Sequence, residues 1–116
     1  MAGANEAVIS AVLNMIDACE AYVNVLNSNA AQLRECVMRL ENGEDVVAVV
    51  RSAPGAPGRE AAKGASDLLD EARVRFRTQL VSACTAGGMT RKEIASNMGI
   101  SRQLIERYLT FAVQSK

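Results

Sequence analysis

The chain has 116 residues, with 13 basic and 13 acidic side chains, no histidine and a formal net charge of zero. This length suits one compact domain, or a small domain with an appended helical region. The missing histidine removes the commonest general base and metal ligand, and no phosphate loop, paired-carboxylate site or nucleophile motif is present. We therefore expect a protein that is not an enzyme and that uses no metal or cofactor.

Hydrophobic residues make up 49% of the chain but aromatic residues only 3%, so its core must be built from small side chains. Helix formers dominate, and β-branched residues show no sustained alternation, which predicts an all-α fold. Such a chain often completes its burial by pairing with a copy of itself.

The charges are unevenly distributed. Residues 1–51 carry three arginines against seven carboxylates, a net charge of −4, whereas residues 71–116 carry eight basic side chains against three acidic ones, a net charge of +5. An asymmetry of this kind points to a polyanion-binding end, although a solvated surface is equally compatible with it.

Residues from about Asn5 to Asn27 show helical spacing, with polar side chains every three or four positions. The opposite stripe has nearly heptad spacing, and we expect it to form a dimer interface, with packing inside the monomer as the alternative. Its members are Val8, Val12, Met15, Cys19, Tyr22 and Leu26, and a second row of Ile9, Leu13, Ile16 and Val23 widens the apolar face. Asn14, Asp17, Glu20 and Asn24 interrupt this run, so neither a signal peptide nor a membrane span is expected.

The middle of the chain is predicted to contain two shorter helices. Asn27-Ser28-Asn29 should break the first helix, and a second should run from about Leu33 to Leu40 and end at Asn42-Gly43. Residues 44–51 are predicted to be helical, although their four valines would equally suit a strand. The Pro/Gly-rich loop at residues 52–58 is the expected boundary between a helical dimerisation region, 1–51, and a second region, 59–116.

Three cysteines, Cys19, Cys36 and Cys84, are far apart and form no CxxC pair. Each lies on the apolar face of a helical pattern, which predicts buried free thiols and a reducing cytoplasm.

The most informative stretch follows a long helix predicted from Gly58 to Ala86, which Gly87-Gly88 should end. Two short helical patterns then meet at Gly99, which can adopt the positive φ that ends the first of them. Thr90 to Glu93 form a capping box, and Ser101 is a suitable N-cap for the second. The apolar residues expected to fill the corner are Ile94, Ala95, Met98, Ile100, Ile105 and Tyr108.

This pattern resembles the wingless, trihelical (homeodomain-like) helix-turn-helix DNA-binding family over about residues 67–115, with an ordinary helical corner as the alternative. The resemblance implies a recognition helix at residues 101–112 in the major groove. The base-reading residues it implies are Ser101, Arg102, Gln103, Glu106 and Arg107, with Thr110 as a further candidate. The phosphate contacts it implies come from Thr90, Arg91, Lys92, Arg73 and Arg77. Some of these arginines are expected to pair instead with Asp70 or Glu71, and a pair between Glu106 and Arg102 is the alternative to base reading by Glu106.

Together these features predict a homodimeric, sequence-specific, double-stranded-DNA-binding protein, a small bacterial or phage transcriptional regulator in the cytoplasm, associated with the nucleoid. One alternative is an adaptor or antitoxin-like protein whose N-terminal helices bind a partner protein, with the helix-turn-helix as scaffold or delivery module. Another is an architectural protein that binds many DNA sites weakly.

Overall fold

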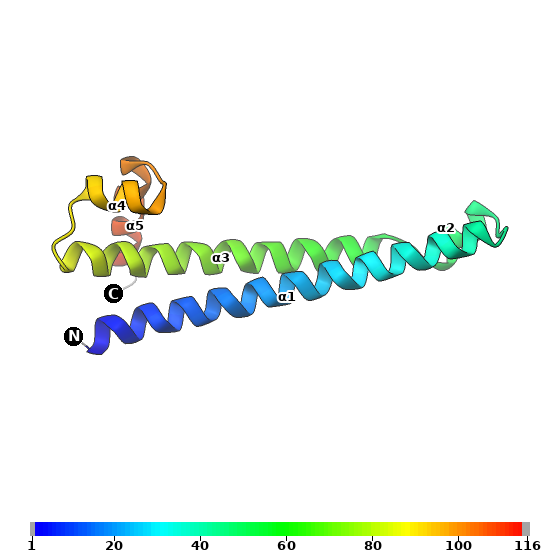
Figure 1. Cartoon of the computed structure of the whole chain (residues 1–116), viewed down its shortest axis with the longest axis horizontal. Helices are drawn as coiled ribbons and strands as arrows, with labels where there is room; N and C mark the ends of the chain where they lie inside the picture. The colour runs from blue at the N-terminus through cyan, green and yellow to red at the C-terminus, as the bar shows by residue number, and fades with distance from the viewer. Residues whose placement is uncertain (1, 115–116) are drawn as a thin grey trace. The chain divides into compact units, whose positions relative to one another are not determined.

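The computed structural model describes the backbone of residues 2–114 and the side chains of residues 5–114. Within these residues the chain forms five helices and no strand, which confirms the all-α prediction (Figure 1). The helices are α1 (Ala2–Glu41), α2 (Val46–Ser52), α3 (Ala56–Ala86), α4 (Arg91–Met98) and α5 (Arg102–Gln114).

The predicted break at Asn27-Ser28-Asn29 is wrong, because α1 continues through these residues as a single helix. Asn29 makes a tertiary contact in place of a turn, and its Nδ2 donates a hydrogen bond to the Gly58 carbonyl at 3.1 Å. A Cβ atom at position 58 would lie only 2.7 Å from Asn29 Oδ1, so the glycine allows the two helices to approach here. Local propensity is a weak guide where a buried contact uses the same polar side chain.

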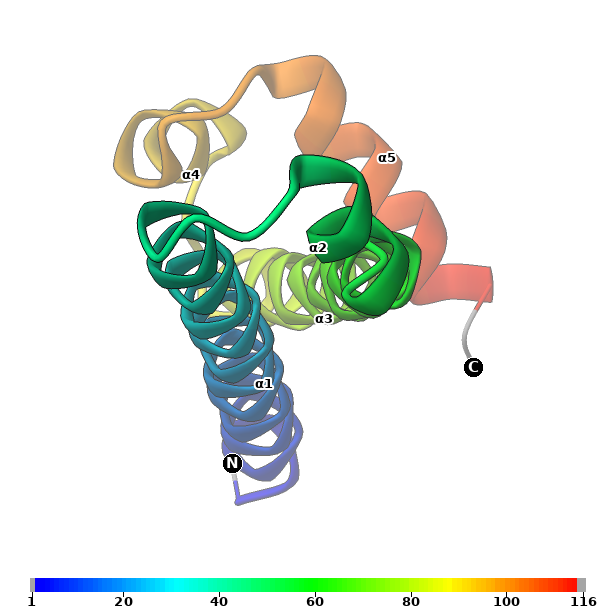
Figure 2. The ribbon, with the colours of Figure 1, turned by 90° about the vertical axis from the view of Figure 1, so that its right-hand side faces the viewer.

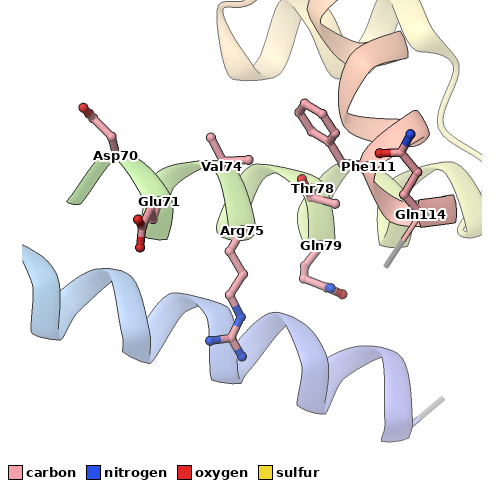
Figure 3. A pocket seen from close by; sticks show the side chains of 8 residues that line it. All are labelled: Asp70, Glu71, Val74, Arg75, Thr78, Gln79, Phe111 and Gln114. Atoms are coloured by element: carbon pink, nitrogen blue, oxygen red, sulfur yellow. The ribbon is translucent and has the colours of Figure 1, made fainter. Parts of the chain in front are cut away.

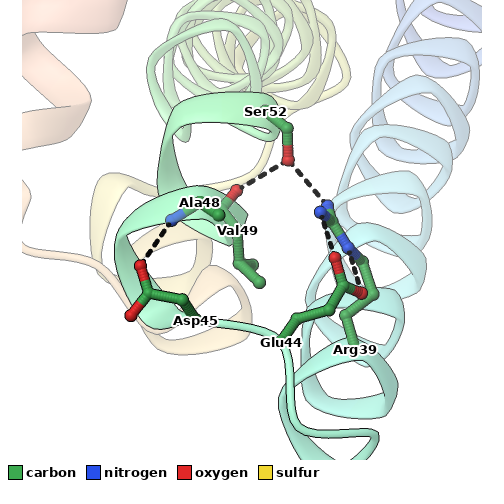
Figure 4. Close-up of polar contacts among 6 residues, drawn as sticks. All are labelled: Arg39, Glu44, Asp45, Ala48, Val49 and Ser52. Carbon is green, nitrogen blue, oxygen red and sulfur yellow. Dashed lines mark hydrogen bonds and ion pairs between the residues drawn. The ribbon is translucent and has the colours of Figure 1, made fainter.

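The end of α1 and the start of α2 are stabilised by local polar contacts (Figure 4). Asn42-Gly43 ends α1 as predicted, and the Asp45 carboxylate accepts a hydrogen bond from the Ala48 amide as the N-cap of α2. Residues 46–52 are therefore helical, and the strand alternative for the valines is excluded.

Arg39 lies beside this turn and binds the Glu44 carboxylate through both Nε and Nη2, at 2.9 and 2.8 Å. Its Nη1 donates to Ser52 Oγ at 2.7 Å, which ties α1 to α2. The hydrogen bond from Arg39, supported by its positive charge, lowers the pKa of Glu44, while the same hydrogen bond raises the pKa of Arg39.

The Pro/Gly-rich connection is shorter than predicted, because α2 extends to Ser52 and α3 already begins at Ala56. Pro57 and Gly58 thus lie in the first turn of α3. Proline is tolerated there because the amide it lacks would have no partner within the helix.

The chain folds into two compact units. The first combines α1 up to Ile16 with the chain from Asp70 onwards, and the second comprises Asp17–Leu69. In the second unit α2 lies beside the end of α1 and the beginning of α3 (Figure 2). Only Val49 and Ala65 are buried in that unit, whereas the first unit contains a continuous apolar core.

Within the described residues, one helical stretch, Asn5–Glu41, is long and apolar enough to cross a membrane, and its most apolar 18 residues have a mean hydropathy of 1.3. That test uses length and composition alone. Asp17 and Glu20 lie within the stretch, and a carboxylate at the centre of a membrane helix costs about 2.5–3.5 kcal/mol on insertion scales. The absence of a membrane span stays a prediction.

Candidate nucleic-acid interface

The corner between α4 and α5 has the local geometry that its residues predict. The Thr90 hydroxyl accepts a hydrogen bond from the Glu93 amide at 3.1 Å, and the Glu93 carboxylate accepts one from the Thr90 amide at 3.3 Å. The capping box is therefore confirmed. Gly99 has a φ of 67°, in the left-handed region, and Ser101 Oγ accepts from the Leu104 amide at 3.1 Å. Both helices thus begin at a side-chain cap, and a glycine ends the first.

A buried core holds this corner against the end of α3. Val81, Ile94, Ile105 and Tyr108 are all at most 4% exposed and form one apolar cluster. The half-buried residues packed against it include Ala95, Met98 and Ile100, which the sequence analysis also placed in the corner. The residues on α4 and α5 are therefore held by three helices that pack on one another.

Val81 is a core residue that the sequence analysis missed. Along α3, the apolar residues Leu69, Ala72, Phe76, Leu80 and Ala83 recur at three- and four-residue spacing. A second row at helical spacing, Val74, Thr78 and Val81, runs on another side of the same helix, and Thr78 and Val81 are buried. Because Thr78 is polar, this row does not stand out as apolar in the sequence. Two apolar rows on one helix indicate packing on two sides.

The first turns of α5 present all the predicted base-reading residues to solvent. Ser101, Arg102, Gln103, Glu106 and Arg107 are exposed, while Ile105 and Tyr108 point into the core. The additional candidate, Thr110, is also exposed, but its hydroxyl donates to the Glu106 carbonyl at 2.9 Å. The exposed face of α5 thus offers guanidinium, amide and hydroxyl groups from one rigid helix.

Glu106 has a partner that the sequence analysis did not foresee. Its carboxylate forms an ion pair with Nε of Arg91, at the start of α4, and not with Arg102. The alternative of a Glu106–Arg102 pair is therefore wrong, because the α4–α5 corner brings Arg91 to the carboxylate from another helix. The two side chains are 47% and 56% exposed, so the pair is solvent-screened and can exchange for another partner.

Most of the predicted phosphate-contacting residues already have partners within the protein. Arg73 pairs with Asp70 at 3.0 Å, as the sequence analysis allowed, and Arg77 donates to the Tyr108 hydroxyl at 3.2 Å, which links α3 to α5. Thr90 is engaged in its capping box, and Arg91 is paired with Glu106. Among the described residues Lys92, Arg102 and Arg107 form no hydrogen bond or ion pair.

The predicted dimer residues divide into two groups. Val8, Val12, Met15 and Tyr22 are half-buried within the monomer, whereas Cys19 and Leu26 are exposed. The second apolar row, Ile9, Leu13, Ile16 and Val23, is between 45% and 57% exposed. The more exposed apolar surface of α1 therefore lies to one side of the predicted stripe.

The cysteines are free thiols, as predicted, but the prediction that they are buried is wrong. Cys19 is exposed, and Cys36 and Cys84 are half-buried. In the described part of the chain, no group of three or more His, Cys, Asp or Glu side chains is placed to hold a metal ion.

A surface cavity of about 580 Å³ lies in the first unit, between α3 and the end of α5 (Figure 3). Val74, Thr78 and Phe111 contribute to its wall, and the Arg75 guanidinium turns away from it to donate to Ser10 Oγ at 3.1 Å. The Thr78 hydroxyl is buried without a hydrogen-bond partner in the structure. The cavity is an open, largely apolar depression, and none of the predicted base-reading residues lines it.

Comparison with protein-family models, with curated proteins and with solved structures finds no match to this chain. The residues and the geometry of the α4–α5 corner are therefore the basis for inferring a function.

Proposed function

We propose that this protein is a sequence-specific, double-stranded-DNA-binding protein, a small homodimeric transcriptional regulator of the helix-turn-helix kind. The observation that carries the proposal is the two-sided character of α5. Its inner side contributes Ile105 and Tyr108 to a closed core, and its outer side exposes Arg102, Gln103 and Arg107 from the first two turns. A recognition helix needs this combination, because base edges can be read only by side chains held in a fixed position.

The exposed chemistry on α5 suits the major groove. An arginine can donate two hydrogen bonds to guanine and a glutamine can pair with adenine, each worth about 1–3 kcal/mol of discrimination. Arg102 and Arg107 have no internal partner among the described residues, so DNA need not displace an ion pair to engage them. Ser101 lies at the helix N-cap, where the positive end of the helix dipole also favours phosphate.

The start of α4 is the second contact region in this proposal. Lys92 lies in its first turn without a partner, and Arg91 beside it is held by the screened ion pair with Glu106. A phosphate or a cytosine amino group can take over one member of that pair. Arg73 and Arg77 act in this arrangement mainly through Asp70 and Tyr108, and Arg77 positions α5 on α3.

One such corner offers few contacts, so tight binding requires two copies. A homodimer would place two corners on half-sites about one helical turn, roughly 34 Å, apart. A regulator of this kind would act on DNA in the cytoplasm without a cofactor.

Binding to fluorescent duplexes tests the proposal. Duplexes selected from a random pool and scrambled duplexes are titrated with salt, using wild type and the Arg102→Ala/Gln103→Ala variant. The matched control, Arg59→Ala/Gln32→Ala, removes the same two residue types from exposed positions outside the corner. We expect the first variant to lose about 10- to 100-fold in preference for selected duplexes, and the control to retain it.

The salt dependence of duplex binding distinguishes a sequence-reading regulator from an architectural DNA-binding protein. Sequence-reading DNA binding predicts a large preference for selected duplexes that persists as salt rises. Binding that is steeply salt-dependent and equal for both duplexes would indicate an architectural protein. Failure to bind any duplex at low salt would reject the proposal.

A partner-protein role is the second candidate, and α2 is the observation that favours it. Val46, Val47 and Val50 are between 51% and 61% exposed on this short helix, and exposed apolar clusters of this kind often mark protein contacts. An adaptor of this type would retain its function when Arg102 and Gln103 are replaced and would lose it when the valines are made polar.

A further inference from the structure

The ten successive heptad core positions of α1 from residue 9 to residue 40 carry no charge. In heptad notation the a positions are Ile9, Ile16, Val23, Ala30 and Val37. The d positions are Val12, Cys19, Leu26, Leu33 and Leu40. We call these ten residues the α1 seam. A repeat sustained over more than three or four heptads is the pattern of a coiled coil.

The α1 seam is largely open in the monomer. Its seven large aliphatic residues other than Val12 are between 40% and 68% exposed, and in the most apolar window of this helix only 6% of the residues are buried. The c and g positions of the same heptads face inward instead. Ala11 is fully buried, and Ala18, Tyr22, Val25 and Asn29 are half-buried. The internal packing of α1 therefore uses a different face from the α1 seam.

We infer that the α1 seam binds the same seam of a second copy of this chain, as a parallel, in-register, two-stranded coiled coil. The seam has the composition of that state, because β-branched residues occupy four of the five a positions and leucine occupies three of the five d positions. This assignment moves Val8, Met15 and Tyr22 from the core of the dimer interface to its flanking g positions, and all three are half-buried in the monomer.

The residues that flank the seam accept this pairing without conflict. In a parallel pair each g residue meets the e residue five positions later in the second copy. Glu20 then meets Met15 of the second copy, and Arg34 meets Asn29, so no like charges face each other. The uncharged core and the absence of facing like charges on the flanks make the face self-complementary, which is what a twofold interface requires.

The parallel orientation rests on the proposed DNA-binding function. The start of α1, up to Ile16, belongs to the same compact unit as α4 and α5. Parallel pairing brings the two copies of this unit to the same end of the coiled coil, where both corners can reach adjacent half-sites. Antiparallel pairing would separate them by about the length of the seam, roughly 48 Å for 32 helical residues.

The oligomeric state tests the pairing independently of DNA. Leu33→Glu places a charge in the seam, and Met38→Glu is the matched control, because Met38 is 62% exposed on the same helix but at a b position. Sedimentation equilibrium of the full chain should show a dimer for wild type and Met38→Glu, and a monomer for Leu33→Glu. Circular dichroism confirms that each variant remains helical. A monomeric wild type, or a dimer that both variants retain, would overturn the inference.

Cross-linking tests the parallel register. Two single-cysteine proteins are compared, one retaining only Cys19 and the other carrying only Leu40→Cys, with the remaining cysteines changed to serine. The azo reagent diamide accepts two electrons and two protons as two thiols form one disulfide. In-register parallel pairing links both proteins as dimers on non-reducing gels, because each d position meets its own copy. Any antiparallel register brings at most one of these positions to its own copy, so linkage of only one would reject the parallel assignment.

The outcomes distinguish this inference from the DNA-binding proposal. A parallel dimer that binds no duplex leaves the seam assignment intact and rejects the DNA-binding function. Selective DNA binding by a chain that stays monomeric supports the function and rejects the seam. Partition of the wild type into lipid vesicles in place of self-association would assign the apolar face to a membrane and reject the second copy as its occupant.

Discussion

The C-terminal corner and the second unit bury their apolar residues to very different extents. The corner encloses Val81, Ile94, Ile105 and Tyr108 within a single chain. The second unit buries only Val49 and Ala65, and leaves Val23, Leu26, Leu33 and several valines of α2 exposed. Both regions are helical and similarly apolar, so composition does not explain the difference. Three crossing helices can surround a common centre, whereas a long amphipathic helix that packs along one side leaves its other apolar face uncovered.

The largest expected effect comes from opening the corner core. Ile105 is fully buried, and Ile105→Ala should reduce the free energy of unfolding of the first unit by about 2–5 kcal/mol, because it leaves a cavity that the three helices cannot fill. Urea unfolding followed by circular dichroism measures this loss.

Two valines, one in each region, allow the corner and the second unit to be compared with the same substitution. Val81 is fully buried in the corner, and Val47 is 51% exposed on α2. Val81→Ala should be clearly destabilising, whereas Val47→Ala should change the unfolding free energy by less than about 0.5 kcal/mol. Equal losses in the two variants would contradict the contrast between the regions.

Glycine substitutions should act with opposite signs in the two regions. Gly99 ends α4 with a φ of 67°, so Gly99→Ala should destabilise the corner by about 1–2 kcal/mol. Gly64 lies inside α3 in the second unit, with no atom close enough to meet an added Cβ. Gly64→Ala should therefore stabilise that unit by about 0.5–1 kcal/mol. Thermal unfolding measures the change in stability for both variants. A destabilising Gly64→Ala would contradict the prediction, because it would indicate a contact at position 64 that is absent from the monomer.

The N-caps of α4 and α2 should also contribute differently to stability, by a smaller amount. Thr90 participates in a reciprocal capping box, whereas Asp45 makes a single capping bond at 3.3 Å. Thr90→Ala should cost about 1 kcal/mol and Asp45→Ala less, because Thr90 takes part in two capping hydrogen bonds and Asp45 in one. Chemical unfolding of the two variants measures both losses of stability. A larger loss for Asp45→Ala than for Thr90→Ala would contradict this prediction.

The smallest expected effect is a pH dependence confined to the second unit. Arg39 lowers the pKa of Glu44 in the folded protein, so the pair stabilises the fold above the ordinary carboxyl value of 4.5. This contribution is lost as the pH falls through the lower, folded-state pKa. The urea midpoint should fall slightly more steeply on acidification for wild type than for Glu44→Gln, and parallel curves would exclude the linkage.

Features that depend on a few neighbouring residues could be predicted from the sequence. The capping box at Thr90, the left-handed Gly99 and the Ser101 cap all arise from hydrogen bonds that span four residues or fewer. The all-α class follows from patterns of similar range. The predictions from sequence fail where residues that are far apart in the chain come into contact. Asn29 was expected in a turn, but it binds Gly58 on another helix.

The ion pairs near the candidate site show the same difference between local and distant contacts. Arg73 pairs with Asp70, three residues away on the same helix, and the sequence analysis allowed for this pair. For Glu106 the sequence offered only a partner within α5 as the alternative to base reading, but the residue pairs with Arg91, which the corner brings close from α4. The base-reading role of these residues is a prediction that the structure leaves to experiment.

The amino-acid order alone determines the all-helical class, the capped corner and a heptad repeat along α1, because each depends on periodicity and hydrogen bonds within a few turns. Only the packing of the helices decides which apolar rows are enclosed. It encloses Val81, which the sequence analysis overlooked, and turns Tyr22 inward while Val23 remains exposed. Neighbouring rows on one helix are equally hydrophobic, so their burial is determined by which side meets another helix.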